Sequence, residues 1–347
     1  MLTTPSLSVC PGGYQQGPTM ELNLTALNCM VSASDVQDVV LPCLFFLMFP
    51  LALLLNGMAA WVSLHLPSSN TFIIYLKNLV AADLLMTLTF PLKAASNLPT
   101  AALGLKVFTC RFSDVVFFKS MYMSITLLGL ISLDRFFKVV RPRGRLLGQN
   151  LLFSRLVCGA AWVVLFGGIA IPTMILTDQE LTNATGYSCM SLKSVAGQNL
   201  HKYSGFFNNI LFWSVSVLVV FCYVCITNKV LQSFRDSGSN NSQGQKKTKL
   251  RVFLVLMVFF VCFVPYHVVR VPYILVQTQT LDRCTDAWIP IANKITLWLS
   301  TTNICLDPLL YVFLCREFRE KLVAMMVLGR KTSGITEDSS QQKSPQG

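Results

Sequence analysis

The sequence has few charged residues for its length, and this shortage excludes most soluble classes of protein. Only 13% of its 347 residues are Asp, Glu, Lys or Arg, about half the share found in a soluble domain. Disorder over most of the chain is also excluded, because 53% of the residues are hydrophobic and disordered chains combine low hydrophobicity with high charge. Acidic residues are scarce, 16 against 28 basic ones. The basic excess lies among long apolar runs, which is unlike a nucleic-acid-binding domain, so we expect no nucleic-acid partner.

Histidine is nearly absent, and this speaks against an enzyme. The chain has only His65, His201 and His267, and it contains neither an HExxH nor a GxSxG motif. Its twelve cysteines are too dilute for a disulfide scaffold, and they lack the spacing of metal ligands. We therefore expect no catalytic residue, no structural metal site and no cofactor.

What the chain has in abundance is long apolar sequence. Seven runs reach the roughly 20 residues that a helix needs to cross a bilayer: 40–65, 72–94, 108–140, 151–176, 203–230, 251–276 and 289–313. Helices are expected because a bilayer has no water to satisfy exposed backbone groups, and the alternating pattern of a membrane β-barrel is missing. The sequence predicts an all-α membrane protein, a bundle of seven transmembrane helices.

The distribution of charge predicts how the chain is oriented in the membrane and how it divides into segments. Basic clusters follow the third and fifth runs and the seventh run, which places these segments in the cytoplasm and the N-terminus outside the cell. The sequons at Asn23 and Asn183 then lie outside and are predicted glycosylation sites. We expect a multi-pass plasma-membrane protein with an extracellular tail (1–35), a seven-helix domain (36–313), a short helix (314–326) and a disordered cytoplasmic tail (327–347).

The segment 314–326 has the pattern of an amphipathic helix on the inner membrane surface. Phe318, Leu322 and Met325 share one face, while basic residues lie elsewhere. This pattern makes membrane lipids an expected partner. Cys315 begins the segment, and two interpretations stay open for it: palmitoylation or a free buried thiol.

Several polar residues interrupt the apolar runs, although each ionisable one costs about 2.5–3.5 kcal/mol on insertion. Asp83 and Ser124 lie at comparable depth in the second and third runs, and Asn303 and Asp307 share one face of the seventh. These four residues are a candidate site for an allosteric sodium ion. The alternative is a hydrogen-bonded network without an ion.

Nine of the 28 basic residues fall on the outer side, against the usual tendency. They are Lys93, Lys106, Arg111, Lys119, Lys193, Lys202, Arg270, Arg283 and Lys294. Converging cations inside a bundle indicate a small anionic extracellular ligand such as a di- or triphosphate. The competing interpretation is solvated salt bridges with outer acids such as Asp114. We favour salt bridges for Lys106, Lys202 and Arg283, and the ligand for Arg270 and Lys294, which lie inside predicted helices.

Short motifs make the chain resemble a rhodopsin-like G-protein-coupled receptor over residues 36–325. The motifs are Leu55–Asn56–Gly57, Ala82–Asp83–Leu84, Asp134–Arg135–Phe136, Cys262–Phe263–Val264–Pro265 and Asp307–Pro308–Leu309–Leu310–Tyr311. Further runs, including Phe90–Pro91–Leu92–Lys93 and Pro265–Tyr266–His267 with Arg270 and Tyr273, are similar to the purinergic nucleotide receptors. The subgroup that it resembles senses ADP or UDP-sugars and signals through inhibitory G proteins.

The resemblance implies a ligand site and two disulfides. The candidate ligand-binding residues are Arg270, Lys294, Tyr273, His267, Gln277, Tyr122, Lys193, His201 and Lys93. His201 has the alternative of a satisfied interfacial residue. The implied disulfides are Cys110–Cys189 and Cys29–Cys284. The chain departs from the subgroup at five positions near the pocket, which are Phe118, Lys119, Thr173, Gly205 and Ile295.

The resemblance also implies a switch. Arg135 is expected to leave Asp134 and to meet a heterotrimeric G protein of the inhibitory class, with Tyr223 and Tyr311 as partners. Pro265, with Phe259 and Phe263 below it, is the expected pivot of the sixth helix. Agonist binding shifts the populations of the two states only through its different affinity for them.

The function expected from these features is a receptor for an extracellular nucleotide, ADP-like, that lowers cyclic AMP. A receptor for a UDP-sugar or a lysophospholipid, or an orphan receptor, is the alternative. A transporter of organic anions is more distant, because transporters are built from repeated halves and no internal repeat is visible here.

Overall fold

The computed structural model describes residues 39–141, 150–179, 188–236, 242–277, 288–325 and 327. These residues form helices and contain no strand. The elements are α2 (Leu41–Leu64), α3 (Thr71–Asn97), α4 (Leu103–Phe108), the π-helical η2 (Thr109–Ser113), α5 (Asp114–Val140), α6 (Leu151–Trp162), the π-helical η4 (Val163–Ala170), α7 (Ile171–Ile175), α8 (Val195–Asp236), α9 (Ser242–Gln277), α10 (Trp288–Thr301) and α11 (Asn303–Leu314).

Length and apolarity identify six of these helical stretches as membrane spans, and Trp288–Phe313 gives a seventh when it is taken together with the helix that follows it. This seventh span is followed by a helix, Arg316–Met325, that is bent from it by 96°. All seven predicted runs therefore lie on helices. The largest difference is in the fifth, where a predicted run of 203–230 belongs to the longer helix α8, Val195–Asp236. Hydropathy marks the apolar part of a helix, whereas the backbone hydrogen bonds continue into polar surroundings.

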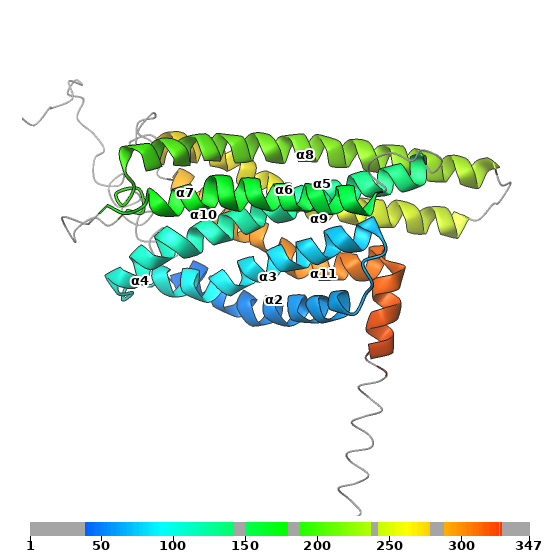
Figure 1. The fold of residues 1–347 in the computed structure, drawn as a ribbon, viewed down its shortest axis with the longest axis horizontal. Helices are drawn as coiled ribbons and strands as arrows, with labels where there is room; N and C mark the ends of the chain where they lie inside the picture. Colours follow the sequence, from blue (N-terminus) through cyan, green and yellow to red (C-terminus); the bar gives the residue numbers. More distant parts are fainter. Residues whose placement is uncertain are drawn as a thin grey trace, which may run out of the picture.

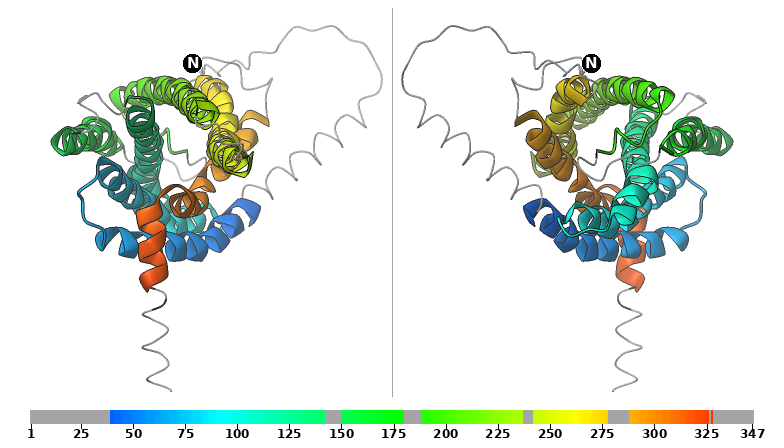
Figure 2. Two further views of the ribbon diagram at one scale, coloured as in Figure 1. Left: turned by 90° about the vertical axis from the view of Figure 1, so that its right-hand side faces the viewer. Right: turned by 90° about the vertical axis from the view of Figure 1, so that its left-hand side faces the viewer.

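The helices lie side by side and form a ring when the bundle is seen from its end (Figures 1 and 2). Around the ring α2 packs on α3, α3 on α5, α5 on α8, α8 on α9, α9 on α10, and α11 returns to α2. Helix α6 packs against α3 and α5, where the indole of Trp162 donates to Asn78 Oδ1 at 2.9 Å. The bundle thus has two ends and a shared interior.

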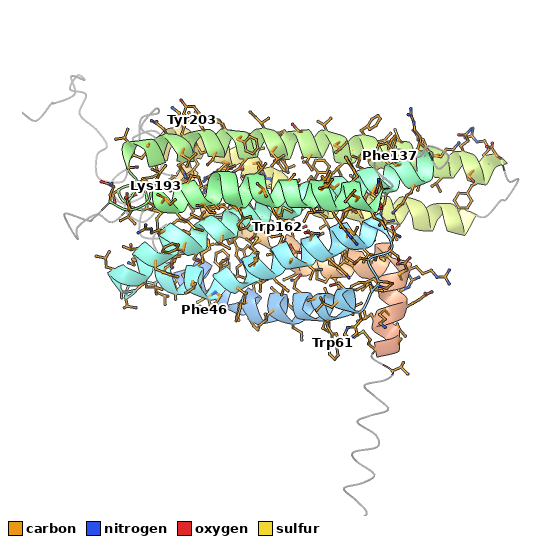
Figure 3. The ribbon with its side chains drawn as sticks, viewed as in Figure 1. Phe46, Trp61, Phe137, Trp162, Lys193 and Tyr203 are labelled. Atoms are coloured by element: carbon orange, nitrogen blue, oxygen red, sulfur yellow. A yellow bond between two sulfur atoms is a disulfide. The ribbon has the colours of Figure 1, made fainter. Side chains whose placement is uncertain are left out.

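Apolar side chains cover the outside of this bundle. Leu47 on α2 is 72% exposed and Val217 on α8 is 70% exposed, and Figure 3 shows Phe46 and Trp61 on the outer side of α2. A soluble surface of this kind would aggregate, whereas a bilayer solvates it. The chain is a multi-pass membrane protein.

The short helix after the seventh span packs partly on the bundle. The ring of Phe318 is buried and meets the ring of Tyr311 edge to face, with centroids 5.9 Å apart. Leu322 and Met325 lie against the same core. The face that the sequence assigns to lipid is therefore shared with protein. The thiol of Cys315 is buried and accepts a hydrogen bond from the backbone N–H of Phe318 at 3.4 Å.

Several predicted features fall outside the described residues. They are Asn23, Asn183, Cys29, Cys284, the side chain of Gln277 and both predicted tails, 1–35 and 327–347, apart from residue 327.

Candidate functional site

A cavity of about 370 Å³ opens into the bundle at the end where Cys110 and Cys189 lie, which we call the cavity end. Pockets for small ligands start at about this volume. Basic side chains from four helices and one loop line it: Lys93, Lys119, Lys193, Arg270 and Lys294. Among the described residues, Asp114 is the one carboxylate in its wall. The cavity is therefore strongly positive.

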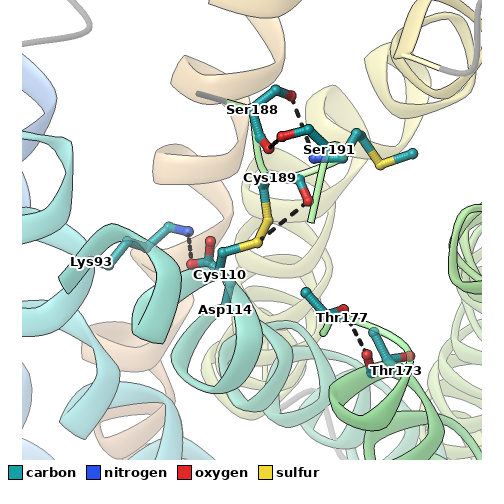
Figure 4. The surroundings of a disulfide bond; sticks show 9 residues. Lys93, Cys110, Asp114, Thr173, Thr177, Ser188, Cys189 and Ser191 are labelled. Atoms are coloured by element: carbon teal, nitrogen blue, oxygen red, sulfur yellow. Dashed lines mark hydrogen bonds and ion pairs between the residues drawn. A yellow bond between two sulfur atoms is a disulfide. The ribbon is translucent and has the colours of Figure 1, made fainter. Parts of the chain in front are cut away.

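A disulfide fixes the loop that crosses the cavity end. Cys110 in η2 is bonded to Cys189, with their Cα atoms 5.8 Å apart (Figure 4). The loop is also held by backbone hydrogen bonds from Gln179 N to Leu192 O at 3.0 Å and from Ser194 N to Leu176 O at 3.1 Å. These constraints hold Lys193 in the cavity wall, where it is buried.

The loop also needs a glycine at the start of α8. A Cβ atom built on Gly197 would lie 2.6 Å from the backbone oxygen of Leu176 and 3.3 Å from Cβ of Lys193. Only a residue without a side chain allows this approach, because a backbone oxygen has no rotamer by which to move aside. Gly197 therefore positions the segment that carries Lys193.

Lys93 is neutralised within the protein. Its ammonium on α3 lies 2.7 Å from Asp114 Oδ1 at the start of α5, as Figure 4 shows. It also lies 4.4 Å from the ring centroid of Phe117. The salt-bridge interpretation of the outer acids thus applies to this lysine, and a ligand has to compete with Asp114 for it.

Arg270 has aromatic neighbours instead. Its side chain on α9 is 7% exposed, and the guanidinium carbon lies 5.5 Å, 5.9 Å and 5.4 Å from the ring centroids of Phe118, Tyr266 and Tyr273. In the described part of the chain it has no ion pair with a carboxylate. Aromatic faces stabilise a cation only modestly and leave its hydrogen-bond donors available. Arg270 is therefore suited to bind an anion bidentately.

Lys193 carries a perturbed ammonium. Burial lowers the pKa of Lys193 to about 8; Asp114 opposes this shift, and Arg270 adds to it by repulsion. An anion placed beside Lys193 would favour its charged form. The protonation of this loop lysine and anion binding are therefore linked.

Seven of the nine candidate ligand residues line the cavity: Lys93, Tyr122, Lys193, His201, Arg270, Tyr273 and Lys294. His267 lies in the layer beneath, where its ring stacks on Phe212 with centroids 3.7 Å apart and its Nδ1 lies 2.8 Å from the backbone oxygen of Phe263. His267 thus belongs to the aromatic packing under the cavity.

The structure adds wall residues that the sequence did not assign to a ligand. Lys119 on α5 is 4% exposed and faces the cavity. Asn208 on α8 and Asn293 on α10 also line it, and each has a buried amide oxygen without a hydrogen-bond partner. The sequence signal for Lys119 is its position in an apolar run, where it counts as a departure from the resembled subgroup. The asparagines carry no charge and give no signal of comparable strength.

One departure from the resembled subgroup has a packing cause. A Cβ atom on Gly205 of α8 would lie 2.5 Å from Cδ1 of Ile274 on α9, and Ile274 is buried. An asparagine at this position would require α9 or the Ile274 side chain to shift. Gly205 therefore lets α8 and α9 approach closely beside the cavity.

Below the aromatic layer, the buried polar residues form one cluster. Ser124 and Tyr311 donate to the two carboxylate oxygens of Asp83, at 2.7 Å and 3.1 Å. Asn303 donates to Asp307 at 2.6 Å, and the two carboxyl groups are close enough to interact electrostatically.

The oxygen atoms of this cluster fit a small hard cation. Oδ1 of Asn303 and Oδ1 of Asp307 are buried without a partner, and a cation would relieve the repulsion between two buried carboxylates. The residues that would hold sodium are Asp83, Ser124, Asn303 and Asp307. In the described ranges, this cluster included, no group of three or more His, Cys, Asp or Glu side chains could hold a metal ion.

At the opposite end of the bundle, Asp134 is held by neighbours other than Arg135. Its carboxylate accepts from Lys138 at 2.7 Å and from the hydroxyl of Thr71. Lys138 donates further to Asn70 at 2.6 Å. The guanidinium of Arg135 lies 4.8 Å from the ring centroid of Phe72. Asp134 thus joins α3 and α5 through Lys138.

The remaining switch candidates lie in the packed interior. Phe259 and Phe263 are buried on α9 with ring centroids 5.3 Å apart, and Pro265 lies inside the same helix. Tyr223 on α8 is buried as well. These residues connect the cavity end to the opposite end.

A membrane bundle with a ligand-sized cavity at one end and the Asp134–Lys138 ion pair at the other has the layout of a G-protein-coupled receptor. Sequence comparison agrees: the profile of the family described as "7 transmembrane receptor (rhodopsin family)" matches residues 55–311. The chain belongs to this family, whose members are receptors and not enzymes.

Relatives place the chain in the purinoceptor-like group of that family. It is 42% identical over 305 residues to purinoceptor 13 of Homo sapiens, covering 88% of this chain and 85% of the relative. It is 41% identical over 301 residues to purinoceptor 14 of Bos taurus, covering 86% and 89%. It is 35% identical over 287 residues to G-protein coupled receptor 87 of Mus musculus, covering 82% and 80%. The chain is a plasma-membrane receptor of the class that binds extracellular nucleotides or nucleotide-sugars.

Proposed function

We propose that this receptor binds an ADP-like extracellular nucleotide and signals through inhibitory G proteins, lowering cyclic AMP. The observation that carries the proposal is the cavity wall, whose described residues include five cations and one carboxylate, and this carboxylate is already paired with Lys93. Such a wall favours a compact polyanion over a neutral or cationic ligand. The similarity to purinoceptors supports a purine nucleotide as the source of that anion.

The pyrophosphate of the ligand lies between α9 and α10 in this proposal. Arg270 on α9 presents a planar fork that matches phosphate oxygens, and Lys294 on α10 also lines the cavity. Tyr122 and Tyr273 offer rings for the base and ribose, and the amide oxygens of Asn208 and Asn293 are acceptors for their N–H and O–H groups.

Activation follows from the same contacts. Phosphates that draw Arg270 and Lys294 together favour the receptor state in which the cavity ends of α9 and α10 are close. Pro265 within α9 provides the pivot. The opposite end of α9 then moves outward, and Arg135 becomes available to the G protein. Sodium at Asp83 and Asp307 would stabilise the inactive state.

The orientation of the chain is part of the proposal. The cavity end faces the outside with the N-terminus, and the end that carries Arg135 and Lys138 faces the cytoplasm. The excess of lysine and arginine in the segments near Arg135 supports this assignment.

The test is a nucleotide panel on cells that express the full chain, read as inhibition of stimulated cyclic AMP. We expect a diphosphate nucleotide to inhibit, and pertussis toxin to abolish the inhibition. Arg270→Ala should reduce potency at least about tenfold, because a charge-assisted contact is lost. Lys202→Ala is the matched control, since Lys202 is a described residue outside the cavity wall. Unchanged potency of Arg270→Ala would contradict the phosphate site.

A further inference from the structure

Lys119, a lysine in the cavity wall, has no opposite charge beside it among the residues that the structure describes. Lys119 on α5 is 4% exposed and lines the cavity. The charged groups that act on it are Arg270 and Lys193, and both are positive. Within the described residues its ammonium has neither an ion pair nor a hydrogen bond. Asp114, the one described carboxylate of the wall, is bonded to Lys93 instead.

An ammonium on a side chain this deep in the bundle is costly even where it faces a cavity. Taking a charge out of water is unfavourable unless an opposite charge or several hydrogen bonds compensate it. Here two further cations add repulsion. A lysine that only filled space would be replaced without loss by an apolar side chain of similar length. The arrangement is therefore suited to bind an anion.

The cations of the wall fall into two groups according to the helix or loop that carries them. Lys294 comes from α10, whereas Lys119 comes from α5 and Lys193 from the loop anchored by Cys189. Arg270 on α9 interacts electrostatically with both Lys119 and Lys193. A pyrophosphate held between Arg270 and Lys294 does not supply a phosphate to Lys119 or Lys193. One more phosphate, extending from Arg270, would bind them.

We propose that Lys119, Lys193 and Arg270 form a subsite for a third phosphate, so that a nucleoside triphosphate binds more tightly than the matching diphosphate. This inference rests on the proposed function and refines the ligand within it. The specificity comes from Lys119, one of the positions at which the chain departs from the resembled subgroup. Two lysines and one arginine provide enough donors for the oxygens of a terminal phosphate.

The experiment compares ADP with the β,γ-methylene analogue of ATP, which resists loss of its terminal phosphate, in the cyclic AMP assay. The variants are Lys119→Met, which keeps length without charge, and Lys119→Arg, which keeps charge. Lys202→Ala is the control for an unrelated surface lysine. Potencies are compared after surface expression is measured with an epitope tag.

We expect the triphosphate analogue to be about tenfold more potent than ADP on the wild type, the effect of one added charge-assisted contact. Lys119→Met should lose about tenfold more potency for the triphosphate than for ADP, and Lys119→Arg should keep the preference. Lys202→Ala should match the wild type for both nucleotides.

Three outcomes would overturn the subsite. They differ in whether the proposed function of the receptor fails as well. Equal potency of the two nucleotides on the wild type rejects the subsite and leaves the proposed function standing. Equal loss for both nucleotides in Lys119→Met makes Lys119 a positioning residue and again leaves that function standing. If neither nucleotide acts on the wild type, the proposed function fails together with the subsite.

Discussion

Lys93 and Asp114 form an ion pair of 2.7 Å that joins α3 to the beginning of α5 at the edge of the cavity. The side chain of Lys93 is 11% exposed and that of Asp114 is 29% exposed, so the pair is partly screened by solvent. It removes one cation from the wall and adds an acid close to Lys193. The pair therefore lowers the affinity of the cavity for anions.

Replacing Asp114 should tighten nucleotide binding. In Asp114→Asn the amide keeps the shape of the side chain, but the positive charge of Lys93 is no longer compensated by a carboxylate. We expect the potency of the activating nucleotide to rise by about three- to tenfold, because a nearby acid no longer competes with the phosphates. The measurement is the concentration dependence of cyclic AMP inhibition at equal surface expression.

A fall in potency for Asp114→Asn would show that the ion pair contributes more by holding α3 against α5 than by lowering the positive charge of the cavity. The double variant Lys93→Met with Asp114→Asn distinguishes the two roles. It removes both charges, so its potency should lie near that of the wild type if the charge balance decides.

Nucleotide potency should depend on pH through Lys193. Its pKa is lowered to about 8, mainly by burial, and its protonated form is the one that attracts phosphate. As pH rises from about 7 to about 9, Lys193 loses its charge, and the affinity for an anion falls. Terminal phosphates are already ionised over this range. The sign is therefore a loss of potency on the alkaline side.

The measurement is nucleotide binding to membranes at pH 7, 8 and 9. Lys193→Arg is the matched variant, because arginine stays charged throughout, and its affinity should vary less with pH than that of the wild type. Affinity that rises with pH, or an equal slope in Lys193→Arg, would contradict the assignment to Lys193.

The sequence predicted the spans well and the pairing inside the cavity poorly, for physical reasons. Hydropathy locates every crossing because the bilayer sets the required length. The partner of Lys93 depends on how α3 is rotated against α5, and that rotation is set by packing. The depth of Lys119 likewise follows from the face that α5 presents to the cavity. The resemblance identified Arg270 by its motif, yet it placed His267 in the cavity wall although this ring packs on Phe212 below it.

Removing Lys138 should raise signalling without agonist. Lys138 binds Asp134 at 2.7 Å and also donates to Thr71, the first residue of α3, and to Asn70, which caps that helix. In Lys138→Met these links between α3 and α5 are lost, and the buried Asp134 keeps only the hydroxyl of Thr71 among the partners described here. We expect basal inhibition of cyclic AMP to increase about twofold or more, because the resting arrangement loses stabilisation.

The control for this variant is Arg316→Met, which removes an exposed ion pair with Glu320 at the same end of the bundle. Such pairs contribute little, so basal signalling should stay at the wild-type level. Lower basal activity in Lys138→Met would show that Lys138 serves the active state instead.

Adding one methyl group at Gly197 should weaken ligand binding from outside the cavity. In Gly197→Ala the new Cβ would approach the backbone oxygen of Leu176 to 2.6 Å, so the loop or the start of α8 has to shift. Overpacking of this kind costs about 1–3 kcal/mol, and the shift moves Lys193, whose Cβ is also close. We expect a lower melting temperature in detergent and a several-fold loss of nucleotide potency.

Gly159→Ala is the matched control, because a Cβ at Gly159 on α6 meets nothing within 4 Å and alanine is the better helix former. Its melting temperature should equal or exceed that of the wild type, and its potency should be unchanged. If Gly197→Ala lowered the melting temperature but kept full potency, the position of Lys193 would not limit binding. Because the two substitutions add the same atom, a difference between them reports the close approach of the loop to α8 and not the loss of glycine itself.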